Sequence, residues 1–173
     1  MKVPERIKMF LWRVAINALP TKENLMCRMD IEDTCCVLYD HQCETSSHLF
    51  VKCPMAKALW FSVCWGLRSD ELHLSTFADI IKLILKPPLA PCQAQDQWLV
   101  SLNMAFILKE IWRTHNVVLH HKGEVDLQSS IQIIHSKVHE CYLFFSKTEH
   151  TNLDLSTPKW SSPPPRTIKI VKL

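Results

Sequence analysis

The feature that most constrains this 173-residue chain is a compact group of cysteine and histidine residues in its first third. Eleven residues separate Cys36 from His48, and four separate His48 from Cys53, in a polar segment rich in turn-forming residues. Thiolate and imidazole are ligands that Zn²⁺ prefers in tetrahedral sites. The spacing therefore indicates a small zinc site, although scattered buried thiols are equally compatible with the composition and spacing alone.

The composition narrows the classes of protein to which the chain can belong. Hydrophobic residues make up 47% of it, enough for a core, while the only glycines are Gly66 and Gly123, which nearly excludes glycine-rich phosphate loops. The sequence contains no run of about 18 apolar residues, so we expect no membrane span. No secretory signal is visible, so we interpret the eight cysteines as reduced thiols of an intracellular protein, in the nucleus or the cytoplasm.

Apolar residues recur at helical spacing through most of the chain. We expect two helices within the first 30 residues, the first of them deeply packed because Trp12 and Ile16 make it apolar on a second side. Further helices are predicted from Pro54 to Gly66, after a Ser75 cap, over about 94–120 and after an Asp126 cap.

The segment 30–53 holds too few apolar residues to fold by burial alone, so a metal ion would stabilise it. The proline-rich stretch after about residue 150 is incompatible with a helix and is predicted to be extended or disordered. The predicted fold is therefore mainly α, with a small irregular Cys/His segment and a disordered C-terminal tail.

Several short motifs follow one another in the first 65 residues. They are Pro4-Glu-Arg-Ile, Phe10-Leu-Trp-Arg13, Ala18-Leu-Pro-Thr21 and, after Cys36, Glu44-Thr-Ser-Ser-His-Leu-Phe-Val-Lys-Cys-Pro54. In this order they resemble the zinc-binding domain that lies downstream of the polymerase in plant non-LTR (LINE-type) retrotransposon reverse transcriptases. The resemblance implies such a domain over 1–66, a helical connector over 67–150 and a linker over 151–173.

The end of the sequence resembles another part of these elements. Trp160 to Lys169 is similar to the proline-rich lead into a plant-type RNase H domain, whose first strand would require Asn at 171 and a catalytic Asp at 173. Val171 and Leu173 occupy these positions, so no RNase H chemistry is carried over. We also see no Asp-Asp pair of a polymerase that could hold two metal ions, and therefore expect a fragment without enzymatic activity.

The resemblance also implies a second cysteine ligand at position 39, where Tyr39 stands. A phenol is a poor zinc ligand beside thiolate and imidazole. Cys43 is the best replacement, and Cys35 and His41 are also near in the sequence. The predicted zinc ligands are therefore Cys36, Cys43, His48 and Cys53, in a structural site, because no general base is evident beside them.

The charge is uneven along the chain. The net charge is +3, but residues 1–30 and 158–173 are basic and the middle is acidic. Basic termini are typical of phosphate contacts or of solvated lysines. We predict phosphate contacts at Lys8, Arg13, Lys52 and Lys57 from charge alone, and interpret His115, His120 and His121 as a solvated helix end.

The sequence thus predicts a zinc-binding accessory module derived from a retrotransposon, without catalysis of its own. Its expected partners are RNA or DNA and a reverse transcriptase polymerase domain, with no membrane and no small-molecule substrate. The alternative is a metal-free helical interaction fragment or a non-functional relic.

Overall fold

The computed structural model describes residues 3–64, 66–72, 74, 76–87, 97–121 and 123–151, without the side chains of 40–42 and 148–151. The predicted linker and RNase H lead-in over 152–173 lie outside these residues. Within the described part of the chain, none of the helices combines the length and the apolarity that a bilayer span requires.

The described residues are mainly helical, as predicted. The helices are α1 (Glu5–Ala15), α2 (Lys22–Met26), the π-helical turn η1 (His48–Lys52), α3 (Pro54–Val63), α4 (Phe77–Leu85), α5 (Gln97–His121) and α6 (Leu127–Thr151). The strands β1 (Cys35–Cys36) and β2 (Tyr39–Cys43) form an antiparallel hairpin. The irregular Cys/His segment of the sequence prediction is thus this hairpin followed by η1.

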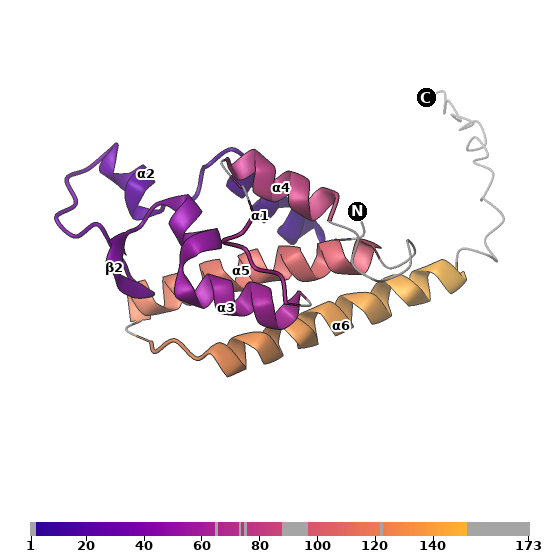
Figure 1. The fold of residues 1–173 in the computed structure, drawn as a ribbon. Coiled ribbons are helices and arrows are strands. Elements are labelled where there is room, and N and C mark those ends of the chain that lie inside the picture. Colours follow the sequence, from indigo (N-terminus) through magenta and orange to yellow (C-terminus); the bar gives the residue numbers. More distant parts are fainter. Residues whose placement is uncertain are drawn as a thin grey trace, which may run out of the picture.

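Helix α5 runs through the middle of the molecule and contacts α1, α3, α4, α6 and η1 (Figure 1). The hairpin and α2 lie together at one end (Figure 1). Buried side chains from before and after residue 66, among them Ile7, Trp60 and Ile107, belong to one core. The predicted domain boundary at residue 66 does not separate two cores among the described residues, and it stays a prediction.

Local signals in the sequence locate most helix ends. Thr21 accepts a hydrogen bond from the backbone of Asn24 at the start of α2, and Asp126 accepts one from Ser129 at the start of α6. Pro54 occupies the first position of α3, where its missing N–H is tolerated. The predicted Ser75 cap is wrong by one residue, because Thr76 forms a capping box with Asp79.

The prediction that α1 is packed on more than one side is wrong. Trp12 is 55% exposed and Ile16 is 53% exposed. The residues of α1 that are buried share one stripe at helical spacing, namely Ile7, Phe10, Leu11 and Val14. That stripe is sufficient to attach the helix to the core, and Trp12 lies on the opposite side.

The prediction that segment 30–53 holds too few apolar residues to fold by burial alone stays a prediction, but the second half of the segment contributes to the core. Leu49, Phe50 and Val51 on η1 are buried in the main core. The buried indole of Trp60 donates a hydrogen bond to the Phe50 carbonyl at 2.8 Å. The segment is therefore attached to α3 by burial as well as by any metal ion.

Candidate metal centre

The structure brings three of the four predicted zinc ligands together. Cys36, His48 and Cys53 each offer a ligand atom within 4.8 Å of the other two. Their residues are 0%, 4% and 0% exposed. Bond lengths of zinc to sulfur and nitrogen imply about 3.5–3.8 Å between the ligand atoms of a tetrahedral site. Small side-chain shifts would therefore allow all three to bind one ion.

The hairpin turn positions the first thiol. Cys36 ends β1, and the backbone N–H groups of Leu38 and Tyr39 lie close enough to hydrogen-bond its sulfur. Such N–H groups stabilise negative charge on sulfur and prepare it for a cation.

The π-helical turn positions the other two ligands. Residues five apart in an α-helix are about 140° apart around its axis, so they face different directions. Here the Cys53 backbone N–H donates to the His48 carbonyl at 2.7 Å, which closes a wider turn between residues five apart. The wide turn lets His48 and Cys53 face the same site.

A hydrogen bond between the two thiols favours the thiolate form of one of them, Cys53. The Cys36–Cys53 hydrogen bond lowers the pKa of Cys53 to about 7, burial opposes this shift, and the N–H groups of Met55 and Ala56 at the start of α3 support it. The same hydrogen bond, together with burial, raises the pKa of Cys36. A thiol–thiolate pair is therefore accessible near neutral pH, and a bound cation would stabilise the second thiolate.

The imidazole is prepared to bind in its neutral form. Burial lowers the pKa of His48, the charges of Lys52 and Lys57 lower it further, and Glu44 opposes them. Its buried Nε2 atom has no hydrogen-bond partner among the described residues. A buried nitrogen that lacks a partner is costly, and coordination of a metal would satisfy it. The donor set and this nitrogen fit zinc.

The fourth predicted ligand, Cys43, is not part of the cluster. It is exposed, it pairs with Cys35 across the hairpin, and its sulfur lies 3.6 Å from the Thr34 hydroxyl. The side chain of His41 lies outside the described side chains. The three clustered ligands leave one coordination position, so the identity of a fourth ligand stays a prediction.

A buried hydrogen-bonded pair lies beside the cluster and was missed by the sequence analysis. Glu44 Oε2 accepts a hydrogen bond from His115 Nε2 at 3.0 Å, and both side chains are essentially inaccessible to solvent. Oε1 accepts from the Lys22 backbone N–H at 3.0 Å. Burial opposes ionisation, but these hydrogen bonds outweigh it and lower the pKa of Glu44.

The interpretation of His115 as part of a solvated helix end is therefore wrong. The imidazole stacks on Trp112, with ring centroids 5.0 Å apart, and is 1% exposed. Its partner is 71 residues away in the sequence. No local pattern connects two residues so far apart, and only the packing of α5 on the zinc segment brings them together.

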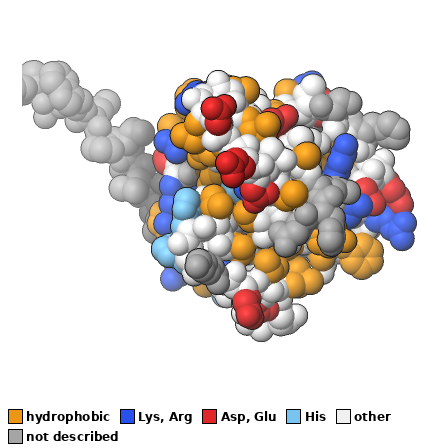
Figure 2. Space-filling view, turned by 90° about the vertical axis from the view of Figure 1, so that its left-hand side faces the viewer, with side chains coloured by type: hydrophobic (Ala, Val, Ile, Leu, Met, Phe, Trp, Pro, Cys, Tyr) orange, Lys and Arg blue, Asp and Glu red, His pale blue; other side chains and the backbone are white. Residues whose placement is uncertain are grey.

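The predicted phosphate contacts fall into two groups. Lys8 and Arg13 lie on α1, where Lys8 pairs with Glu5 at 2.6 Å. Lys52 and Lys57 flank the cluster, and Lys57 pairs with Asp70 at 3.1 Å. The face at the end that carries α2 and β2 shows acidic and hydrophobic side chains near its middle and Lys and Arg toward its edges (Figure 2). That face is not a basic surface.

Comparison with known proteins finds a family match for the first part of the chain. Residues 1–60 match the model of a family described as zinc-binding in reverse transcriptase. Neither a curated protein nor a solved structure matches the chain. The matched residues contain the whole cluster and Glu44, but not His115. This match supports a zinc-binding domain of the reverse transcriptase type in this part of the chain, in agreement with the motifs.

We predict that the purified chain binds about one zinc ion and that Cys53→Ser abolishes binding, because the cluster would retain only two of its ligands. Metal analysis after dialysis measures this. Cys27→Ser, which removes an exposed thiol outside the cluster, is the matched control.

The Cys43→Ser variant separates the sequence prediction from the observed geometry. Loss of zinc would support Cys43 as the fourth ligand, whereas retention is expected from its position outside the cluster. Metal well below one equivalent in both the unaltered chain and Cys27→Ser would contradict the zinc site.

We predict that His115→Ala lowers the free energy of unfolding by about 3–5 kcal/mol, because it leaves the Glu44 carboxylate buried without its partner. Urea unfolding of the zinc-loaded chain measures this. His120→Ala changes an exposed residue on the same helix and should cost less than about 0.5 kcal/mol. Equal effects of the two substitutions would show that the buried pair does not stabilise the fold.

Proposed function

We propose that this chain is a retrotransposon-derived accessory module in which zinc stabilises a nucleic-acid-associated domain without catalysis of its own. The observation that carries the proposal is the buried cluster of Cys36, His48 and Cys53 inside the segment that matches the reverse transcriptase zinc-binding family. The proposal has three parts: the role of the metal, the partner and the origin.

Burial of the cluster supports a structural role for the metal. Catalytic zinc sites keep a position open to water or substrate, whereas structural sites are closed. All three ligand residues here are less than 5% exposed. Zinc bound to them would hold the hairpin, η1 and the start of α3 in one arrangement, and would thereby fix the directions of Lys52 and Lys57. Reduced thiols of this kind suit an intracellular protein.

The partner and the origin extend the proposal beyond the family match. A zinc-binding domain of a reverse transcriptase operates in a protein that handles RNA and DNA, so the proposed partners are nucleic acid and a polymerase domain. The order of the motifs from Pro4 to Pro54 and the Trp160–Lys169 segment support a plant LINE-type element.

One observation favours the alternative, a metal-free helical interaction fragment or a relic. Tyr39 occupies the position where the resemblance implies a cysteine, and the cluster contains three ligands among the described residues. A site that lacks one thiolate binds zinc less tightly.

We predict that the zinc-loaded chain binds single-stranded RNA with an affinity that falls as salt rises. Three or four phosphate contacts correspond to a slope of about −2 to −3 in a plot of log K against log salt concentration. Filter binding across a salt series measures the slope, and chelator-treated protein is the control. No binding at low salt would contradict the proposed partner and support the alternative.

A further inference from the structure

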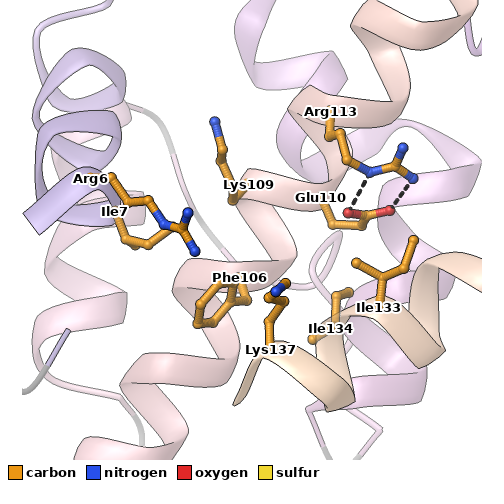
Figure 3. A pocket seen from close by; sticks show the side chains of 9 residues that line it. All are labelled: Arg6, Ile7, Phe106, Lys109, Glu110, Arg113, Ile133, Ile134 and Lys137. Atoms are coloured by element: carbon orange, nitrogen blue, oxygen red, sulfur yellow. Dashed lines mark hydrogen bonds and ion pairs between the residues drawn. The ribbon is translucent and has the colours of Figure 1, made fainter. Parts of the chain in front are cut away.

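A second candidate site lies away from the cluster, in a pocket between α1, α5 and α6. Its volume is about 350 Å³, which is within the range of small-ligand sites. Its walls carry four cationic side chains, Arg6, Lys109, Arg113 and Lys137, and a single carboxylate, that of Glu110. Arg6 and Lys137 reach from opposite walls toward Phe106 (Figure 3).

The carboxylate is already engaged. Arg113 donates two hydrogen bonds to Glu110, at 2.8 and 2.6 Å, and Glu110 is 4% exposed. Lys137 pairs with Glu140 outside the lining, at 2.8 Å. Among the described residues, no ion pair joins a carboxylate to Arg6 or Lys109, although the hydrogen bond from Lys137 and, from a greater distance, the charge of Arg6 lower the pKa of Glu140. The pocket therefore holds positive charge that its own residues do not balance.

The surroundings of Lys109 are unfavourable for the positive charge of its ammonium group. Burial lowers the pKa of Lys109, and the positive charges of Arg6 and Arg13 lower it further. Its ammonium lies 4.8 Å from the centre of the Phe10 ring, a weak partner compared with an anion. An anion placed between Arg6 and Lys109 would relieve this repulsion.

The rest of the lining is apolar. Ile7, Phe106 and Ile134 are each no more than 5% exposed and contribute to the floor of the pocket. Such a floor suits the flat, weakly polar body of a sugar or base next to a phosphate. Arg13 lies two turns along α1 from Arg6, so positive charge continues outside the pocket along one direction.

We propose that a single-stranded nucleic acid lies in this pocket, with a backbone phosphate between Arg6 and Lys109 and the adjoining nucleoside on Ile7, Phe106 and Ile134. The inference rests on the proposed function and assigns its nucleic-acid contact to a new place. Of the four contacts predicted from charge alone, only Arg13 borders this site. Lys52 and Lys57 lie instead beside the metal cluster.

The test compares two variants of equal charge in the full zinc-loaded chain. Arg6→Gln with Lys109→Met removes the two unbalanced pocket cations and keeps an apolar chain over Phe10. Arg68→Gln with Lys82→Met removes two exposed cations elsewhere. We expect at least tenfold weaker binding of fluorescent single-stranded RNA for the pocket variant only. The slope of log K against log salt concentration should become shallower by about 0.7, because the two cations share one phosphate contact.

A third variant should act in the opposite direction. Glu110→Gln removes the negative charge from the pocket and keeps the shape of the side chain, so RNA should bind several-fold more tightly. In a parallel measurement, bound RNA should protect Lys109, but not Lys82, from an amine-modifying reagent. Zinc content and melting temperature confirm that each variant is folded.

The outcomes separate the inference from the proposed function. If the unaltered chain binds neither RNA nor DNA, the proposed function fails and the inference fails with it. If it binds RNA and the pocket and control variants weaken binding equally, the inference alone is overturned. Inorganic phosphate or a mononucleotide that competes as well as the strand would also overturn it, since the pocket would then be a small-anion site.

Discussion

The rest of the structure depends on the burial of an imidazole and two thiols inside the hydrophobic core. Cys36 and Cys53 have no exposed surface, and they belong to the same core as Leu49 and Phe50. The Nε2 atom of His48 has no hydrogen-bond partner among the described residues, a state that costs about 1–3 kcal/mol. A divalent ion would remove that cost and satisfy both sulfurs at once. The metal would therefore act as part of the core, because apolar packing around the ligands already holds them close together.

The Glu44–His115 pair extends this arrangement into the second half of the chain. Glu44 lies four residues before His48, and His115 lies on α5, beyond the residues that match the zinc-binding family. Lys22 adds a third connection, since its ammonium donates to Asp33 and to the Cys35 carbonyl while its backbone N–H donates to Glu44. The hairpin, α2 and α5 are thus joined by polar contacts that are buried at Glu44 and partly buried at the Lys22 ammonium. A zinc segment expressed without α5 would expose the Glu44 carboxylate and part of its own core.

Local patterns in the sequence predicted the parts of this structure that depend on local physics. Helical spacing of apolar residues, the Thr21 and Asp126 caps and Pro54 at the first position of α3 correctly located most helices, because these signals act within one or two turns.

The cluster of Cys36, His48 and Cys53 was predicted from ligand type and spacing. The structure leaves Cys43 outside this cluster, since nearness in sequence does not determine which way a residue on β2 points, and its role as a ligand stays a prediction. Sequence reasoning failed for Trp12 because hydrophobicity alone does not show that a helix has only one packed side. His115 was missed because its environment is created by contacts between segments 71 residues apart.

The positions of the positive charges indicate how the metal and the pocket could be related. The face near α2 and β2 carries acidic side chains at its middle (Figure 2), whereas the unbalanced cations Arg6 and Lys109 lie between α1 and α5. Lys109 and His115 are on the same helix, six residues and about 9 Å of helix axis apart. A change at the cluster that displaced Glu44 would act on α5 through His115, and α5 forms the central wall of the pocket. In the proposed arrangement, zinc therefore contacts no phosphate. Zinc would influence nucleic-acid binding only indirectly, through the contact of Glu44 with His115 on the helix that also carries Lys109 and Arg113.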